Sequence, residues 1–396
     1  MNPWRTPLVL LLLAGLFGCA SAPSRPTAVE PDQEPARAET AAEPATTDEA
    51  PAPVTAEPEA GAEPGPIRIT LVGDIMLGGT ATEFMQRHGY DYAFAGVEPE
   101  LQRADVLFGN LEGPLTNGGE PAPDKQYLFR TPPAKVAPAL ARAGFDVVSL
   151  ANNHTLDYGA TGLFDTETAL FDAGIRGVGA GRDAGAARRA AIVERGGHRV
   201  GFLAYSNTFP DSFWAAADEP GTAFGHRRHV EADVHALRPR VDTVVVSFHW
   251  GREATTELRP YQPMLARAAI DAGADIVAGH HPHVLQGVER YGDGIIFYSL
   301  ANFTFGSYSE IARVSAIAHV TVDRDGPRAV ELVPINVYNP DILFQPRPLT
   351  GEAASTVVEH LQSLAEPLGT RLADDNGRAR LRLGSDTTDS QAAAVQ

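Results

Sequence analysis

Three histidines lie within four positions in the stretch Asp275–Gly287, which reads Asp-Ile-Val-Ala-Gly-His-His-Pro-His-Val-Leu-Gln-Gly. The run Ile276–Ala278 has the length and β-branching of a buried strand, and a glycine ends it. Neutral imidazole binds zinc, iron, manganese and copper, and His281 and His283, on either side of rigid Pro282, can face one cavity. The stretch predicts a metal site at a strand end, and the alternative is a loop of solvated histidines.

Four other predicted strands also end in polar residues of the metal-binding type. These strands are expected at Ile67–Val72, Ala104–Phe108, Phe145–Leu150 and Val241–Phe248. The residues that follow them are Asp74, Asn110 with Glu112, Asn153 with His154, and His249. Because open α/β sheets place ligands at the carboxyl ends of their strands, we expect these side chains to meet at one sheet edge.

The mixture of ligand types indicates which ions such a site would take. The set has two carboxylates, one amide oxygen and three imidazoles, namely Asp74, Glu112, Asn153, His249, His281 and His283. Without a thiolate, this set favours manganese, iron or zinc and disfavours a structural zinc site. It exceeds the four ligands of one tetrahedral ion, so two divalent ions about 3.5–4 Å apart are predicted.

Each member of the set also has a simpler interpretation. Asp74 could cap a helix, Asn153 could close a turn, and His249 could be a core histidine. Glu112, beside Gly113-Pro114, could be an exposed turn residue. Their coincidence at equivalent strand ends favours a composite site over four separate explanations.

Strands and helices alternate along the rest of the folded region. Helices are expected at 81–88, 132–143, 163–173 and 261–272, and further strands at 175–178, 190–194, 200–205, 295–300, 315–322 and 329–337. Residues 210–228 contain aromatic residues without a period and are expected to form a loop. The alternation predicts an α/β layered fold.

The N-terminus resembles a secretory signal. A basic start precedes the apolar run Leu8–Leu13, which is too short to span a bilayer, and Cys19 is the only cysteine. Because a lone cysteine forms no internal disulfide, and because Leu16–Cys19 resembles a bacterial lipoprotein cleavage site, we expect a signal peptide at 1–19 and a lipid anchor on Cys19. The protein is therefore expected to be a lipoprotein of the cell envelope, at the outer membrane or on the periplasmic or extracellular face. The alternative is simple secretion.

Charge and composition divide the mature chain. Residues 20–66 are rich in Pro, Ala, Glu and Thr, so a disordered tether is expected there, a folded domain at 67–383 and a disordered tail at 384–396. The tether has ten acidic and two basic residues, which accounts for eight of the eighteen net negative charges. The folded part is therefore only mildly acidic, and without a basic stripe or tail no nucleic-acid partner is expected.

Six motifs resemble those of the CapA family, which is associated with bacterial capsule and poly-γ-glutamate synthesis. They are Gly73–Leu77, Asn110–Pro114, Ala151–His154, His249–Gly251, Gly279–Val284 and Tyr298–Phe303, in order between about Ile67 and Val337. The family is similar in turn to calcineurin-like metallophosphoesterases. The resemblance implies a two-sheet β-sandwich flanked by helices, an anionic polymer or small anionic substrate, and capsule-synthesis membrane proteins as partners.

The resemblance also implies individual roles. Asp74 and His283 would bind a first metal ion, Glu112 would bridge, and Asn153, His249 and His281 would hold the second. His154 and Asn110 would be catalytic, with His154 as the acid. Glu253 would line the pocket wall and contact substrate. Apart from the resemblance, Arg130 in the stretch 127–130 could be an additional anion clamp for substrate, and it could equally be a solvated loop residue. Met76 departs from the phosphoesterase pattern, which has a histidine there.

The predicted mechanism is metal-assisted hydrolysis of an amide or phosphoester bond, in which water attacks and His154 protonates the leaving group. Two alternatives stay open at this point. One is a non-catalytic subunit for polymer assembly or anchoring, and the other is a scaffold that has lost its metal, which Met76 would favour.

Overall fold

The first of two large sheets has ten strands, with β1 (Ile67–Met76) near its middle. Its order is β17 (Ala373–Asp375), β18 (Arg378–Arg382), β15 (Gly326–Asn336), β14 (Val314–Asp323), β1, β2 (Val106–Leu111), β3 (Val147–Ser149) and β4 (Arg176–Val178), with β13 (Asn302–Phe305) paired to β1 and β16 (Arg347–Pro348) to β15. The strands β1 to β4 run parallel. Their carboxyl ends therefore share one edge, which supplies Asp74 and Asn110 to the site.

The second sheet has six strands in the order β11 (Val288–Tyr291), β12 (Gly294–Phe297), β10 (Ile276–His280), β9 (Thr243–His249), β7 (His198–Ser206) and β6 (Ala191–Arg195). Its four inner strands are parallel, and a hairpin partner flanks them on each side. A small third sheet joins β5 (Ala180–Gly181) to β8 (Gly221–Thr222). The valine-rich runs of β9 and β10 suit strands that are covered on both faces.

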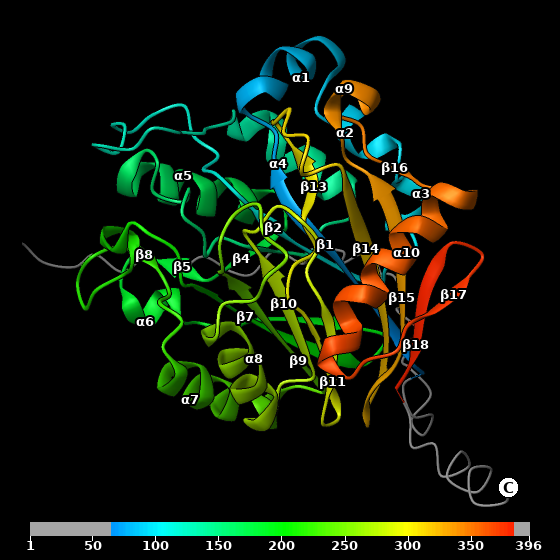
Figure 1. Cartoon of the computed structure of the whole chain (residues 1–396). Helices are drawn as coiled ribbons and strands as arrows, with labels where there is room; N and C mark the ends of the chain where they lie inside the picture. The colour runs from blue at the N-terminus through cyan, green and yellow to red at the C-terminus, as the bar shows by residue number, and fades with distance from the viewer. Residues whose placement is uncertain (1–64, 384–396) are drawn as a thin grey trace, which may run out of the picture. The chain divides into compact units, whose positions relative to one another are not determined.

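The two large sheets pack face to face over a shared apolar core. Alternate residues of β1, such as Ile69 and Leu71, meet residues of the second sheet, such as Val245. Phe108 on β2 stacks on Phe202 of β7 with ring centroids 5.3 Å apart. The computed structural model, which describes residues 65–383, thus confirms the predicted α/β two-sheet sandwich flanked by helices (Figure 1).

Helices cover the outer faces of the sandwich (Figure 1). They are α1 (Thr82–His88), α2 (Tyr92–Ala95), α3 (Glu98–Leu101), α4 (Pro133–Arg142), α5 (Gly159–Asp172), α6 (Ala184–Ala187), α7 (Arg227–Leu237), α8 (Tyr261–Asp271), α9 (Asn339–Ile342) and α10 (Gly351–Ala365). Val136 and Leu140 of α4 pack on the first sheet, and Val230 and Val234 of α7 on the second. The spacing of four residues turns both members of each pair to one face of the helix.

Two sequence predictions about the strands are wrong. Asp74, Asn110 and His249 do not follow their strands but lie within the last residues of β1, β2 and β9, and β10 continues through Gly279 to His280. The strands also do not share one sheet edge, because β1 to β3 belong to the first sheet and β9 and β10 to the second. Apolar runs locate strands but carry no signal for which sheet a strand joins.

Close backbone approach explains the glycines of two motifs. A Cβ on Gly73 would lie 1.9 Å from the carbonyl oxygen of Ala301, and one on Gly279 would lie 2.0 Å from that of Tyr298. The register of β1 against β2 shifts between Leu71 and Asp74, at the same level as this approach. Only glycine leaves room for the neighbouring chain there, and the irregularity directs Asp74 into the site.

Other segments were misread or missed from the sequence. Residues 210–228 hold β8 and the start of α7 rather than a continuous loop. The helix α10 was not predicted, although Val357, Val358 and Leu361 pack on the core at helical spacing. Within residues 65–383, no helix is long and apolar enough to cross a membrane. The predicted signal peptide, Cys19, almost all of the tether and the tail lie outside the described residues.

Candidate metal centre

The ends of the two sheets meet at Asp74, Asn110 and His249. The Asn110 amide nitrogen donates to Asp74 Oδ1 at 2.9 Å and lies 3.3 Å from His249 Nδ1. All three side chains are buried. Residues from β1, β2 and β9, which are separated by as many as 175 positions, thus form one polar cluster at the seam between the sheets.

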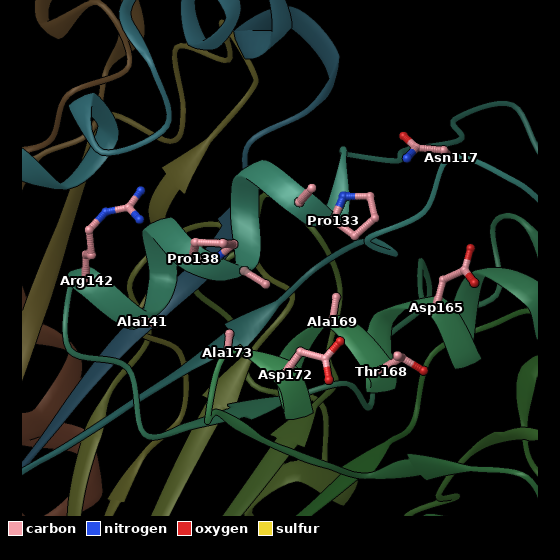
Figure 2. Close-up of a pocket in the computed structure, with 12 residues that line it drawn as sticks. Asn117, Pro133, Pro138, Ala141, Arg142, Asp165, Thr168, Ala169, Asp172 and Ala173 are labelled. Carbon is pink, nitrogen blue, oxygen red and sulfur yellow. The ribbon is translucent and has the colours of Figure 1, made fainter.

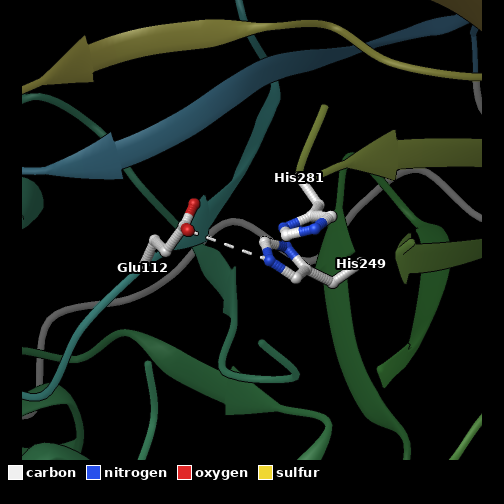
Figure 3. Close-up of side chains that lie close together, drawn as sticks. All are labelled: Glu112, His249 and His281. Atoms are coloured by element: carbon white, nitrogen blue, oxygen red, sulfur yellow. Dashed lines mark ion pairs between the residues drawn. The ribbon is translucent and has the colours of Figure 1, made fainter. Parts of the chain in front are cut away.

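Glu112 lies at the middle of this cluster, directly after β2. Its Oε1 is 3.8 Å from Nε2 of His249, 3.8 Å from Nε2 of His283 and 4.0 Å from Nε2 of His154. Figure 3 shows the carboxylate directed at His249 and His281. Both carboxylate oxygens are buried and have no hydrogen-bond partner. Distances near 4 Å are too long for hydrogen bonds, but they match the gap between two donors that share a metal ion with bonds of about 2 Å to each.

The loop after β10 brings His281 and His283 to the same place. Nδ1 of His283 lies 3.1 Å from Asp74 Oδ2 and 2.9 Å from Asn302 Oδ1, and the His281 backbone N–H donates to Asp74 Oδ2 at 3.3 Å. His281 has φ +94° and His283 has φ +59°. Non-glycine residues with positive φ are strained, and such strain concentrates at functional sites, where the surroundings enforce it.

The electrostatics of the cluster call for a cation. Burial raises the pKa of Glu112 well above its usual range, and Asp74 adds to this effect. In the described part of the chain its ion-pair partners are histidines, and neither Lys nor Arg pairs with it. Burial lowers the pKa of His283, but Glu112 and Asp74 outweigh it and raise the pKa to about 10. A proton on His283 thus neutralises carboxylates that a metal ion would otherwise neutralise.

The remaining imidazoles are in the form that binds metals. Burial lowers the pKa of His249 well below its ordinary value, and burial together with His283 lowers that of His281 to about 3. Both rings are therefore neutral at physiological pH, and Nδ1 of His281 is buried without a hydrogen-bond partner. Neutral, unpartnered imidazole nitrogen is the ligating state of histidine.

The donor atoms form three overlapping groups, in each of which the atoms lie within 4.8 Å of one another. The groups are Glu112 with His249 and His281, Asp74 with Glu112 and His283, and Glu253 with His281 and His283. Asn153 joins the first group, since its Oδ1 is 2.8 Å from His249 Nε2. Glu112 belongs to two groups, as a bridging ligand would. The donor types and the orphaned carboxylate both fit divalent metal ions.

His154 stands beside this cluster with its ring fixed from behind. Its Nδ1 is 2.7 Å from Asp157 Oδ2 and 3.0 Å from Lys125 Nζ, and Phe129 packs on the ring at 4.5 Å between centroids. The Nε2 atom is left facing Glu112. Lys125 also forms an ion pair with Asp157, whose side chain is fully buried. The arrangement leaves one ring nitrogen of a held histidine free to transfer a proton.

Comparison with known proteins assigns the family. The family model described as "Bacterial capsule synthesis protein PGA_cap" matches residues 68–307, more than half of the chain. The chain belongs to this family. It is 34% identical over 290 residues to "Capsule biosynthesis protein CapA" of Bacillus anthracis, covering 72% of this chain and 70% of that protein. It is 33% identical over 271 residues to "PGA biosynthesis protein CapA" of Bacillus subtilis, covering 68% and 71%.

A solved structure is also similar over part of the chain. The 5'-nucleotidase precursor of Thermus thermophilus aligns with a TM-score of 0.41 at 19% identity, over 77% of this chain and 59% of that one. The capsule-family match contains every residue of the cluster described above. It includes neither Cys19 nor α10.

Within this capsule-family domain, two predicted residues have surroundings that differ from their predicted roles. Asn110 is fully buried, and its amide is engaged by Asp74 and by Asn152, which donates to its Oδ1 at 3.1 Å. Its amide group therefore holds the Asp74 carboxylate in place, and its catalytic role stays a prediction. The Arg130 guanidinium lies over the Tyr158 ring, 4.5 Å from its centroid, and does not line the cavity beside the centre.

Three residues of the site were missed. Asp157 had a weak signal, since it follows His154 by three positions in one turn. Asn302 also had a signal, since it follows the predicted strand at 295–300 and lies in the motif Tyr298–Phe303, but it was given no role. Lys125 had none, because a contact from a distant loop leaves no local pattern. Met76, where the phosphoesterase pattern has a histidine, is buried at the end of β1 and lines a small void with Glu112.

Two cavities of the described part of the chain can be compared as places for a ligand. One of about 520 Å³ opens beside His154, His283 and Glu253, and its other walls include Tyr127 and Phe305. A larger one of about 750 Å³ lies between α4 and α5, where Pro138 and Ala141 face Ala169 and Ala173 (Figure 2). The larger cavity has no imidazole, so only the smaller one places a ligand against the metal-binding cluster.

Proposed function

We propose that this chain is an envelope-tethered, metal-dependent hydrolase that acts in the synthesis of capsule poly-γ-glutamate or a related anionic exopolymer. The observation that carries the proposal is Glu112, a buried carboxylate without a hydrogen bond and surrounded by the imidazoles of His154, His249 and His283. An ion-free structural role would leave both oxygens of this buried carboxylate without a hydrogen bond, which is costly in a protein interior.

The donor groups support two divalent ions, which would be manganese, iron or zinc. Asp74, Glu112 and His283 would hold one ion, and Glu112, Asn153, His249 and His281 would hold the other. When bound, the ions would supply Lewis acidity toward a carbonyl or phosphoryl oxygen and would make water acidic enough to act as a nucleophile near neutral pH.

The chain's own residues would position and protonate the reacting groups. Asp157 and Lys125 hold Nδ1 of His154, so its Nε2 would deliver a proton to the departing amine or alkoxide. Phe129 keeps this ring in place and excludes water from one face. Asn110 and Asn302 orient Asp74 and His283, respectively.

The cavity beside the cluster supports an anionic substrate indirectly. Its lining has no Lys or Arg, and its walls include Tyr127, Phe129, Phe305 and Tyr308. We infer that the aromatic walls contact methylene groups next to the scissile bond, and that the positive charge attracting the substrate would come from bound ions. The capsule and PGA functions named for the relatives support a γ-glutamyl amide over a phosphoester.

Turnover by the metal-loaded full chain tests the proposal. We expect poly-γ-glutamate to be shortened in the presence of Mn²⁺ or Zn²⁺, with a slower reaction on a generic phosphodiester, and no reaction after chelation. Preparations that bind the ions but cleave neither substrate would contradict hydrolysis and favour a subunit for polymer assembly. Preparations that bind no ion would contradict the metal centre itself.

The location in the envelope is a separate proposal that rests on Cys19 and the sequence before it. Acylation of Cys19 would anchor the domain through the Pro- and Glu-rich segment, within reach of capsule-synthesis membrane proteins. We expect radioactive palmitate to label the wild-type chain and not Cys19→Ser. Release of wild-type protein into the medium without label would contradict the anchor.

A further inference from the structure

Glu253 is an exposed carboxylate that faces the metal-binding histidines. It lies in the loop after β9, and one of its oxygens is within 4.8 Å of ring nitrogens of both His281 and His283. It also lines the cavity of about 520 Å³. The sequence had suggested that it binds substrate, and the structure places it beside two imidazoles.

The loop that carries Glu253 is fastened to the histidine loop. The Ala254 N–H donates to the Pro282 carbonyl at 2.9 Å, and the Gln286 amide donates to the Thr255 carbonyl at 3.0 Å. Ala254 has φ +59°, a left-handed conformation that alanine rarely adopts. The backbone beside Glu253 is thus held against Pro282, which lies between the two histidines, so the approach of the carboxylate does not depend on a free loop.

Glu253 adds a third carboxylate to the cluster. Its field raises the pKa of Glu112, and Asp74 is part of the same cluster. In the described part of the chain, Glu253 makes no ion pair with Lys or Arg. Three carboxylates thus converge on a region whose other members are imidazoles, and a divalent ion there would offset their mutual repulsion.

We propose that Glu253 is a metal ligand that completes the coordination of the ion held by Asp74, Glu112 and His283. This inference rests on the proposed metal centre and changes the role of Glu253 from substrate contact to ligand. The His283 ion then has three carboxylates and one imidazole, whereas the His249 ion has one carboxylate, one amide and two imidazoles. Oxygen-rich sites favour harder ions, so the His283 position takes Mn²⁺ or Fe²⁺ in preference to Zn²⁺.

A third carboxylate also changes the charge that substrate meets. Two divalent ions against Asp74, Glu112 and Glu253 leave a net charge of plus one, compared with plus two if Glu253 is not a ligand. The centre would then be matched to a substrate group with a single negative charge. A backbone γ-glutamyl residue, with one α-carboxylate, has this charge, whereas a phosphomonoester has nearly two.

Titration of the chelator-treated full chain with Mn²⁺ tests the ligand role, with calorimetry for affinity and electron paramagnetic resonance for the environment of the ion. We expect wild-type protein to bind two ions. Glu253→Gln should weaken one of them tenfold or more, on the scale of lost metal-site contacts, and leave the other unchanged. Because Glu253 is exposed, this variant should keep the fold, which circular dichroism checks.

Glu257→Gln is the matched control, since Glu257 is an exposed carboxylate of the same loop that belongs to none of the candidate metal groups. It should bind both ions as wild type does. Equal weakening by the two variants would show a general charge effect and overturn the proposal, and so would two unchanged ions in Glu253→Gln. If wild-type protein binds no Mn²⁺, the metal centre fails as well, which separates the two proposals.

Discussion

Two clusters of buried charge lie at different places in the protein, one at the seam between the two sheets and one between α3 and the first sheet, and they use similar residues. One is the candidate metal-binding cluster around Glu112. The other joins Glu100, His319 and Glu331, and its ligand atoms are also close enough to hold an ion. In this second cluster, however, Arg103 and Arg378 bind both carboxylates at 2.5–2.8 Å.

The difference lies in what compensates the carboxylates. Glu100 accepts from two arginines and lies 3.3 Å from His319, and Glu331 is bound additionally by Arg380. Contacts with His319, Arg378 and Arg103 outweigh burial and hold the pKa of Glu100 far below its ordinary value. The pKa of Glu112 shifts in the opposite direction because burial dominates there. Acids and histidines that lie close together therefore do not by themselves indicate a metal site. Such a site is indicated only where no arginine or lysine already balances the carboxylates.

The largest expected effect comes from removing an imidazole of the metal-binding cluster. His281→Ala should bind less metal and should lose at least about 100-fold in activity. The reason is that the substitution removes one of the ligands that would hold an ion together with Glu112. Elemental analysis and turnover measure the two losses, and His249→Ala should behave alike. His319→Gln, in the arginine-bound cluster, is the control with unchanged metal content. An alanine variant that keeps both ions and activity would refute the assignment.

A smaller loss is expected from His154, which lies beside the ions but is held by Asp157. His154→Ala should reduce turnover by about 10²–10⁴-fold, the usual contribution of a general acid, while both ions stay bound. Metal analysis alongside kcat separates this outcome from the previous one. Loss of an ion in His154→Ala would instead make His154 a ligand.

A substitution in the arginine-bound cluster should change the stability of the fold and leave metal binding unchanged. Glu100→Gln leaves Arg103 and Arg378 with one fewer buried counter-charge, so the free energy of unfolding should fall by about 3 kcal/mol. Urea denaturation measures this change, and metal content should stay at the wild-type value. Glu98→Gln, exposed on the same short helix, should change stability by less than about 0.5 kcal/mol. Equal effects of the two substitutions would show that the arginine-bound cluster does not stabilise the fold.

The smallest effect is a pH dependence of the metal-free protein. A carboxylate whose pKa is lowered by folding, such as Glu100, stabilises the fold above its unfolded pKa of about 4.3, and this contribution is lost as pH falls further. Burial lowers the pKa of His319, so the fold also loses stability below about pH 6.5. We expect the unfolding free energy to decrease by about 1 kcal/mol in total between pH 7 and pH 4. Glu100→Gln should flatten the slope below pH 5, and an unchanged slope would contradict the assignment.

Much of the fold was predictable because its signals are local. Runs such as Val241–Phe248 and Ile276–Ala278 locate strands through β-branched apolar residues, and Tyr261–Ala272 has the spacing and glycine stop of a helix. The helix α10 was missed, although Val357 and Leu361 mark its buried face, because it lies beyond the recognised motifs. Membership of β9 and β10 in a second sheet was not predictable, since pairing depends on contacts across the chain.

The amino-acid sequence by itself determined which donor atoms are present and that they lie near the ends of strands, because residue type and apolar runs are properties of short segments. Only the tertiary structure decided that Glu112 lacks a partner while Glu100 has two arginines, and that Asp157 and Lys125 hold His154. Compensation of a buried charge depends on side chains that fold beside it from distant parts of the chain, and short-range patterns do not encode those neighbours.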